Sequence, residues 1–303
     1  MKVGIIGGAG LLGSTTAFRL ALLDVVDEIV LIDIKENLVK SHVMDMEQAI
    51  SEYNQTHIRA GAWSDLKGCN IVLLSASMPE TNVKSRLEYL EANLRIIQSV
   101  CGHIKEHCPE AVIINATNPV DVINLAIYKL TGVKPSQIIG FSRNDTLRMK
   151  WAIAKVLSLN TTDISALCLG EHGEKQVPLF SRIFVNGKPY TLTDEQKKKV
   201  LFEMGNWFSD YQSLKSGRTS GWTSALGLAR LIKYIVVDFD EIVPCSAILQ
   251  GEYGQHDVSV GVPVQLGSNG IKKVIEYPLN EEEKRDFVEA VKKIKQLSKQ
   301  HVK

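Results

Sequence analysis

The chain has 303 residues, of which 45% are hydrophobic, so it can form one large domain or two modest ones around a sizeable core. Its formal net charge of +1 gives no field of the kind that attracts nucleic acid or a membrane surface. No apolar run is as long as a membrane span, and the strand-like residues after Met1 leave no room for a signal peptide. The five cysteines contain no CxxC pair, which argues against a metal site and a disulfide framework. We therefore expect a cytoplasmic protein without a bound metal.

The first half of the chain alternates short apolar runs with longer amphipathic segments. Strands are expected at VGIIG, EIVLIDI, CNIVLLSAS, AVIINAT and QIIGF, and helices over 11–23, 38–50 and 87–107. The strands are nearly continuous runs of Val, Ile and Leu, which is typical of strands buried on both faces. This pattern predicts an α/β fold with a doubly wound parallel sheet, the Rossmann arrangement.

The pattern changes after about Ser142, so we place one domain over 1–142 and a second over 143–303. Helices are expected over 144–157, 193–214 and 218–237, and ISALCLGEHG should be a strand that runs into a loop. The segment YGQHDVSVGVPVQLGSNGIKKVIEY has the alternation and turn glycines of antiparallel strands. A final helix should begin after Asn280, which can cap it. The second domain is therefore expected to be mixed α+β.

A glycine-rich turn joins the first strand to the first helix. Gly8, Gly10 and Gly13 form the pattern GxGxxG in that position, which lets a pyrophosphate approach the backbone N–H groups at a helix N-terminus. Asp33 lies twenty residues after Gly13, at the end of the next strand. A carboxylate there can bind the two ribose hydroxyls of NAD and repel the extra phosphate of NADP. Loop, helix and acid together favour an NAD-binding domain over a simple glycine turn.

Three further segments carry side chains suited to proton transfer and carboxylate binding. His172 lies between glycines in GEHGEKQVP, and a histidine can exchange a proton near neutral pH. Asp145 and Arg148 lie in SRNDTLRMK, and Arg86 precedes a long helix. A buried Asp would orient the imidazole, and an Arg fork would bind a substrate carboxylate through two parallel bonds. Spacing along the chain does not show that these residues meet in space.

In chain order, GGAGLLG, LIDI, SRLEYLEAN, NATNPVDV, NDTLR and LGEHGEKQVP resemble the motifs of the lactate/malate dehydrogenase family. The resemblance covers essentially the whole chain, and GEYGQHDVSVGVPVQLGSNG is most similar to the lactate-dehydrogenase-like malate dehydrogenases. It implies a Rossmann NAD-binding domain followed by a mixed α+β catalytic domain. The implied reaction is reversible hydride transfer between NAD and a small L-2-hydroxy acid. The implied assembly is a homodimer or a homotetramer.

The resemblance also implies roles for single residues. His172 would be the catalytic acid and base, with Asp145 as its partner, and Arg86 would polarise the reacting carbonyl group. The residues expected to contact the substrate are Arg148, Asn118 and Glu80. The residues expected to contact the cofactor are Gly8, Gly10, Leu11, Leu12, Gly13, Asp33, Ser75, Ala76, Asn93 and Asn118.

Glu80 departs from the family pattern. The matching position is usually Arg in malate dehydrogenases, where it pairs with the second substrate carboxylate, and Gln in lactate dehydrogenases. A carboxylate there would repel a second carboxylate, so we expect a 2-oxo acid with a neutral side chain. Two alternatives remain open. One is malate dehydrogenase proper, with another basic group such as Lys84 serving the second carboxylate. The other is a catalytically inactive NAD-binding protein, against which the four residues His172, Asp145, Arg148 and Arg86 argue.

Overall fold

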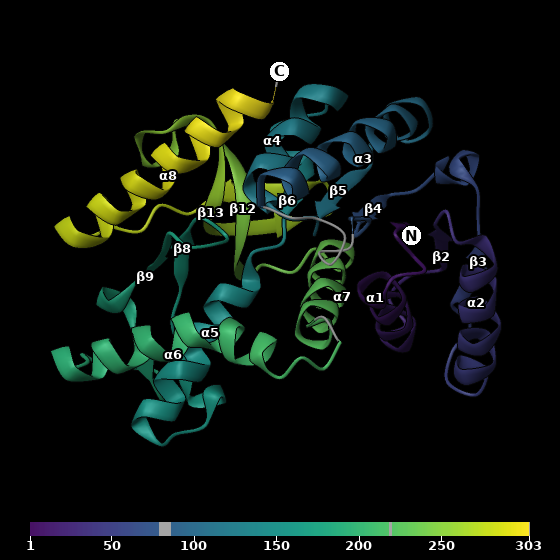
Figure 1. Cartoon of the computed structure of the whole chain (residues 1–303). Coiled ribbons are helices and arrows are strands. Elements are labelled where there is room, and N and C mark those ends of the chain that lie inside the picture. The colour runs from purple at the N-terminus through teal and green to yellow at the C-terminus, as the bar shows by residue number, and fades with distance from the viewer. Residues whose placement is uncertain (79–85, 218–219, 303) are drawn as a thin grey trace.

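The computed structural model describes residues 1–78, 86–217 and 220–302. The first half forms a parallel sheet in the order β3-β2-β1-β4-β5-β6, seen edge-on in Figure 1. The strands are β1 (Lys2–Ile6), β2 (Glu28–Ile32), β3 (His57–Ala60), β4 (Ile71–Leu74), β5 (Val112–Asn115) and β6 (Ile138–Gly140). This is the Rossmann strand order, in which the chain reverses direction across the sheet between β1 and β4. The predicted doubly wound sheet is therefore confirmed.

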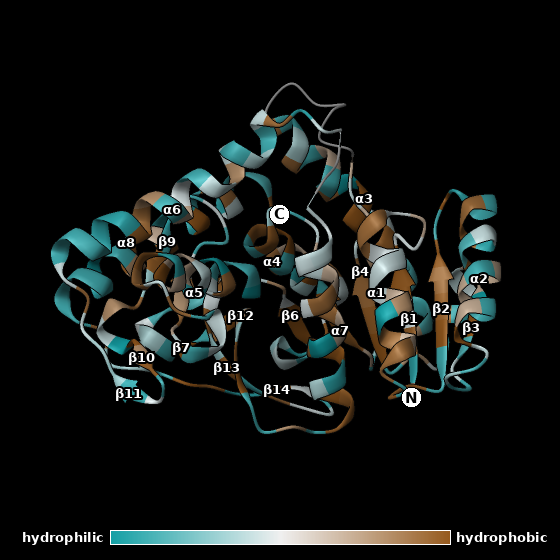
Figure 2. Cartoon of the chain, turned by 90° about the horizontal axis from the view of Figure 1, so that it is seen from below, coloured by the Kyte–Doolittle hydropathy of each residue, from teal (hydrophilic) through white to brown (hydrophobic). Residues whose placement is uncertain are grey.

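The side chains of these strands alternate between two separate cores, as the pleat of a strand requires. Val3 and Ile5 face one core, and Ile6 faces the other. The first core is covered by α1 (Leu11–Leu22) and α2 (Glu36–Ile50), and the second by α3 (Arg86–His107) and α4 (Val120–Thr131). Figure 2 shows the strands of this sheet largely in the brown of apolar residues. Burial on both faces explains why the strands are continuous apolar runs.

The second half of the chain extends the same sheet beyond β6. In the described residues, one sheet of 11 strands continues through β12, β13, β8 and β9, with β14 paired to β13. The first junction is antiparallel, with Ser246 opposite Gly140. The added strands are β8 (Cys168–Gly170), β9 (Gln176–Pro178), β12 (Ile242–Gln250), β13 (His256–Gly267) and β14 (Gly270–Val274). A small separate sheet holds β7 (Ile164–Ser165), β10 (Phe184–Val185) and β11 (Lys188–Pro189).

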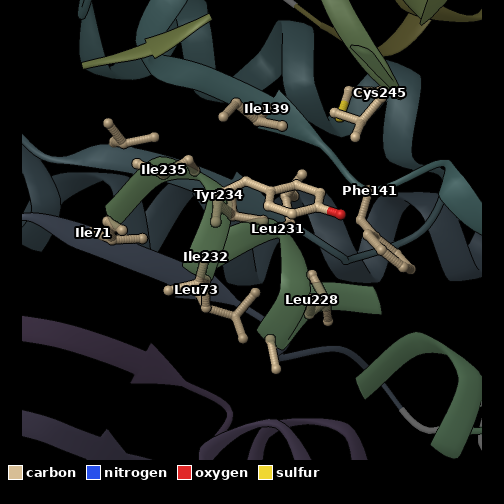
Figure 3. Close-up of a cluster of buried hydrophobic side chains, with 14 of the residues drawn as sticks. Ile71, Leu73, Ile139, Phe141, Leu228, Leu231, Ile232, Tyr234, Ile235 and Cys245 are labelled. Carbon is tan, nitrogen blue, oxygen red and sulfur yellow. The ribbon is translucent and has the colours of Figure 1, made fainter. Parts of the chain in front are cut away.

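The second half also supplies helices α5 (Arg143–Leu157), α6 (Asp194–Ser213), α7 (Trp222–Val236) and α8 (Glu281–His301). Helix α7 packs against α1 and covers the sheet of the first half (Figure 3). Its side chains Leu228 and Ile232 share one core with Ile71 and Leu73 of β4. The approach is close, because a Cβ atom on Gly227 would lie 2.6 Å from the ring of Phe141. The two halves of the chain therefore share one hydrophobic core.

Most predicted elements are present, with ends that differ by a few residues. The helix expected over 218–237 begins at Trp222, and Asn280 caps α8 by accepting a hydrogen bond from the backbone N–H of Glu283 at 2.9 Å. Among the described residues, six helices and strands were not predicted: β3, α4, β9, β10, β11 and β12. Helix α4 and strand β12 are buried on nearly all sides, so neither shows the periodicity of a half-exposed element. None of the described helices has the length and apolarity needed to span a bilayer.

Candidate active site

The glycines of the loop between β1 and α1 have different surroundings. Two of them are closely packed, and one faces open space. A Cβ atom on Gly13 would lie 2.3 Å from the carbonyl oxygen of Gly7, and one on Gly8 would lie 2.9 Å from Leu31. Gly10 differs, because within the described parts of the chain a Cβ atom there would have a single close neighbour, the Gly7 oxygen at 3.4 Å. The fold therefore requires glycine at positions 8 and 13. At Gly10 the protein leaves room in front of the N-terminus of α1, where Leu11 and Leu12 begin the helix.

Asp33 lies beside this loop, directly after β2. Its Oδ2 atom accepts a hydrogen bond from the Ala9 N–H at 3.1 Å, and its Oδ1 atom accepts one from the Lys35 N–H at 3.0 Å. The side chain of the next residue, Ile34, is 92% exposed. Ile34 also lines a shallow pocket together with residues 35–38. The acid expected to select the cofactor is therefore held at the loop, next to the exposed apolar side chain of Ile34, which was not predicted as part of the site.

The loops after β4 and β5 form a second wall at the same edge of the sheet. Ser75 donates a hydrogen bond to the Ile6 carbonyl at 3.0 Å, and Thr117 donates one to the Ala76 carbonyl at 2.9 Å. Asn93 is completely buried, and its amide group links the N–H of Met78 to the carbonyl of Asn118, each at 2.8 Å. The structure thus uses Asn93 to fix the two loops. The exposed side chain of Asn118 has no partner among the described residues.

His172 and Asp145 are 27 residues apart in the chain and in direct contact in the structure. His172 Nδ1 lies 2.6 Å from Asp145 Oδ2, and the other carboxylate oxygen accepts a hydrogen bond from Gln176 Nε2 at 2.9 Å. The side chains of His172 and Asp145 are 20% and 7% exposed. Asp145 lies in the first turn of α5, directly after β6, and His172 follows β8. Because Nδ1 is engaged, Nε2 is the nitrogen that can exchange a proton with a ligand.

The surroundings of His172 favour its protonated form. Burial lowers the pKa of His172, but the charge and hydrogen bond of Asp145, with a smaller contribution from Asp121, outweigh it and raise the pKa above its ordinary value. Arg148 opposes this effect. A raised pKa means that the imidazolium persists to higher pH and is lost as the pH rises through that value.

Arg148 is a cation without a carboxylate partner in the described part of the chain. Its guanidinium group lies over the ring of Trp207 from α6, 4.8 Å from the centroid. No described carboxylate lies within 4.0 Å of it, and burial lowers its pKa, although the charge of Asp145 works against this. A partly desolvated guanidinium beside the His172–Asp145 pair is suited to bind an anionic ligand group.

Some predicted residues cannot be placed, and some useful ones were missed. Glu80 and Lys84 lie outside the described residues, and so does the side chain of Arg86, whose backbone begins α3. Two residues of the site, Gln176 and Asp121, were not predicted. Asp121 accepts a hydrogen bond from the His172 N–H at 2.8 Å. The only available signals were the positions of Gln176, four residues after His172, and of Asp121, three after Asn118.

Comparisons with known proteins agree on one family. The family model for the lactate/malate dehydrogenase NAD binding domain matches residues 1–140, and the model for the alpha/beta C-terminal domain matches residues 143–303. Malate dehydrogenase of Haloarcula marismortui is 30% identical over 296 residues, which cover 97% of each chain. L-lactate dehydrogenase 1 of Staphylococcus aureus is 31% identical over 304 residues, which cover 98% of this chain and 95% of the relative.

The three-dimensional comparison gives the same result. The structure of the malate dehydrogenase from Aeropyrum pernix matches with a TM-score of 0.92 and 32% identity, covering 98% of this chain and 97% of that one. The family descriptions and the names of the relatives indicate an NAD-dependent oxidoreductase that acts on hydroxy acids. The relatives are named for two different substrates, malate and lactate. The chain therefore belongs to the lactate/malate dehydrogenase family and is an NAD-dependent 2-hydroxy acid dehydrogenase.

Proposed function

We propose that this enzyme reduces a small 2-oxo acid with a neutral side chain, such as pyruvate, and oxidises the matching L-2-hydroxy acid. The observation that carries the catalytic part is the position of Arg148, which has no carboxylate partner among the described residues, beside the His172–Asp145 pair. A carboxylate on Arg148 would leave the 2-oxo group of the same substrate close to His172. The neutral side chain is inferred from Glu80, on the sequence resemblance alone. An inactive NAD-binding protein would have no use for this arrangement.

The residues at the glycine loop fit NAD. The open space in front of Gly10 suits a pyrophosphate, and the first turn of α1 carries no acidic residue that would repel it. Each carboxylate oxygen of Asp33 accepts one backbone N–H and can accept a ribose hydroxyl as well, and the exposed Ile34 side chain offers an apolar surface for an adenine ring. When bound, the reduced cofactor supplies the hydride that adds to the carbonyl carbon.

The chain's own residues supply the proton and the charge. In the reduction direction, protonated His172 gives the proton on Nε2 to the carbonyl oxygen and keeps the proton on Nδ1, which Asp145 holds. Arg148 binds the substrate carboxylate through its fork. Arg86 supplies positive charge where the oxyanion develops, and the Asn118 amide donates a hydrogen bond to the same oxygen. In the oxidation direction, neutral His172 takes up the hydroxyl proton.

A panel of 2-oxo acids, assayed by the oxidation of NADH, tests this proposal. We expect turnover of pyruvate and of its longer neutral homologues, with a lower kcat/KM for oxaloacetate. A higher kcat/KM for oxaloacetate than for every neutral acid would identify a malate dehydrogenase. The absence of turnover with the whole panel would favour the inactive NAD-binding alternative.

We further propose that the chain assembles as a homodimer or homotetramer. Support comes from large apolar side chains on the surfaces of two helices, where Phe202 of α6 is 66% exposed and Leu226 of α7 is 54% exposed. Exposed apolar surface of this kind is typical of protein–protein contacts.

The wild-type enzyme should prefer NAD over NADP because of Asp33. Loss of two carboxylate–hydroxyl bonds and repulsion of the extra phosphate together correspond to about 2–4 kcal/mol, or a preference of tens- to hundreds-fold. The measurement is kcat/KM with the two cofactors, for the wild type and Asp33→Ser. The control is Asp45→Asn, which removes an exposed carboxylate from α2. Equal values for both cofactors in the wild type would remove Asp33 from this role.

Replacing Glu80 with Arg should change the substrate preference toward oxaloacetate. At about 5 Å and an effective dielectric constant of about 20, two carboxylates repel each other by roughly 3 kcal/mol, or two orders of magnitude in kcat/KM. The experiment measures kcat/KM for wild type and Glu80→Arg, each with oxaloacetate and pyruvate. Glu91→Arg makes the same charge change at an exposed position of α3 and serves as the control. If the ratio of the two substrates is unchanged in Glu80→Arg, Glu80 does not determine specificity.

A further inference from the structure

Asp121 is a buried carboxylate next to the candidate active site. The proposed reaction gives it no role. It follows Asn118 in the segment NPVD and lies in the first turn of α4, with 3% of its surface exposed. Burying a carboxylate is costly unless its oxygens are hydrogen-bonded. An acid at this position therefore calls for an explanation beyond packing.

Both oxygens of Asp121 have partners from other parts of the fold. Oδ2 accepts a hydrogen bond from the backbone N–H of His172 at 2.8 Å, and Oδ1 accepts one from the Ser246 hydroxyl of β12. The Ser246 and Ser259 hydroxyls lie 2.8 Å apart, and Asn124 donates to the Ser246 carbonyl and to the Ser259 hydroxyl, each at 3.1 Å. The loop that carries His172 is thus bound to a buried polar network of α4, β12 and β13.

We propose that Asp121 is a positioning residue for His172. It holds the backbone of the catalytic loop in place, and its negative charge acts together with that of Asp145 in favour of the protonated imidazole. This inference rests on the proposed acid–base role of His172. It assigns a function to a residue that touches neither the substrate nor the cofactor in the proposed reaction.

The charges around the pair set the direction of the effect. Asp145 and Asp121 both raise the pKa of His172, while burial and Arg148 lower it. Glu171 lies next to Asp121 and disfavours its ionisation, but Glu171 is itself paired with Lys293 of α8 at 3.0 Å. Burial raises the pKa of Asp121 to about 6, against the hydrogen bonds from Ser246 and His172. The two hydrogen bonds favour the ionised form of Asp121, and the charge of that form acts on the imidazole.

Two substitutions separate the charge of Asp121 from its hydrogen bonds. Asp121→Asn keeps an oxygen that can accept from the His172 N–H and gains an NH₂ group that can donate to Ser246. It removes the charge and keeps both contacts, although the Ser246 hydroxyl must then accept instead of donate. Asp121→Leu removes the charge and the hydrogen bonds, and leaves the His172 N–H without its acceptor. The matched control is Glu283→Gln, because Glu283 is another buried carboxylate that accepts from a backbone N–H and a hydroxyl, both of Ser181.

The experiment measures two pH titrations for each variant. The first follows the imidazole of His172 by NMR, assigned with His172→Asn, and the second follows kcat/KM for pyruvate reduction. In Asp121→Asn, we expect both midpoints to fall by roughly one pH unit, so that activity is nearly normal well below the wild-type midpoint and several-fold reduced above it. Asp121→Leu should lose kcat at every pH, and Glu283→Gln should keep both wild-type midpoints.

The proposal is wrong if the His172 midpoint in Asp121→Asn equals that of the wild type, because a purely structural role would lower stability without moving it. If Asp121→Asn does not fold, Ser246→Ala takes its place. Loss of the hydroxyl makes the carboxylate harder to ionise, so the His172 midpoint should fall by a smaller amount, and an unchanged midpoint would again overturn the proposal. The NMR titration needs no turnover, so a failure of this inference is distinguishable from a failure of the proposed function.

Discussion

His172→Asn should lower kcat for pyruvate reduction by roughly a hundredfold or more, which is the usual contribution of a positioned general acid. Asn can keep a hydrogen bond to Asp145 but has no proton to give at neutral pH. The binding of NADH should be unchanged, because His172 lies in the loop after β8 and not in the glycine loop. The measurements are single-turnover rates with saturating NADH and a fluorescence titration of NADH binding.

The control for this substitution is His57→Asn, an exposed histidine at the start of β3. It should keep wild-type values in both measurements. Near-normal turnover by His172→Asn would mean that another group carries the proton, and the assignment of the His172–Asp145 pair would have to be abandoned. Loss of NADH binding in His172→Asn would instead indicate a wider disturbance of the site.

Arg148→Ala should reduce kcat/KM for every 2-oxo acid by about a hundredfold to ten-thousandfold. The estimate takes two charge-assisted hydrogen bonds to the substrate carboxylate at roughly 1.5–3 kcal/mol each. Arg148→Lys keeps the positive charge but loses the fork, so it should raise KM more than it lowers kcat and should lie between Ala and the wild type. Steady-state kinetics with pyruvate gives both values.

Arg148 also packs on Trp207, so a loss of packing must be separated from a loss of binding. Arg182→Ala is the matched control, because the Arg182 guanidinium lies over the Tyr277 ring at 3.8 Å, outside the candidate site. Both Ala variants should lose some thermal stability, and only Arg148→Ala should lose activity. A KM for pyruvate that is the same in Arg148→Ala and the wild type would show that another group binds the carboxylate.

The sequence predicts those parts of the fold and site in which the evidence is local. Gly8, Gly10 and Gly13 lie within one turn, and Asp33 directly follows the next strand. Spacing alone therefore indicates a phosphate-binding loop and the carboxylate expected to bind the ribose. The capping of α8 by Asn280 is equally local. In these cases, the residues that interact are close in the chain, or belong to neighbouring strands of a regular sheet.

The parts that could not be predicted depend on contacts between distant segments. The bond between His172 and Asp145 joins the loop after β8 to the first turn of α5, two segments that also meet where the Cys168 N–H donates to the Thr146 hydroxyl. Strand β12 was missed because it is buried on both faces and contains Pro244. No pattern in NPVD indicates that Asp121 reaches a backbone N–H 51 residues away. Such contacts depend on tertiary packing. The spacing of residues in a single sequence does not show which distant segments will pack together.

Helix α7 comes from the second half of the chain but covers strands of the first half. It therefore limits where the chain can be cut into separate parts. A cut near residue 142 would strip α7 from the sheet and leave Ile71, Leu73 and Phe141 facing water. The nucleotide-binding half is therefore no independent module that could be expressed alone, or exchanged between enzymes by joining gene fragments at that point. A working chimaera would have to inherit α7 together with the sheet it covers, although the two are encoded about eighty residues apart.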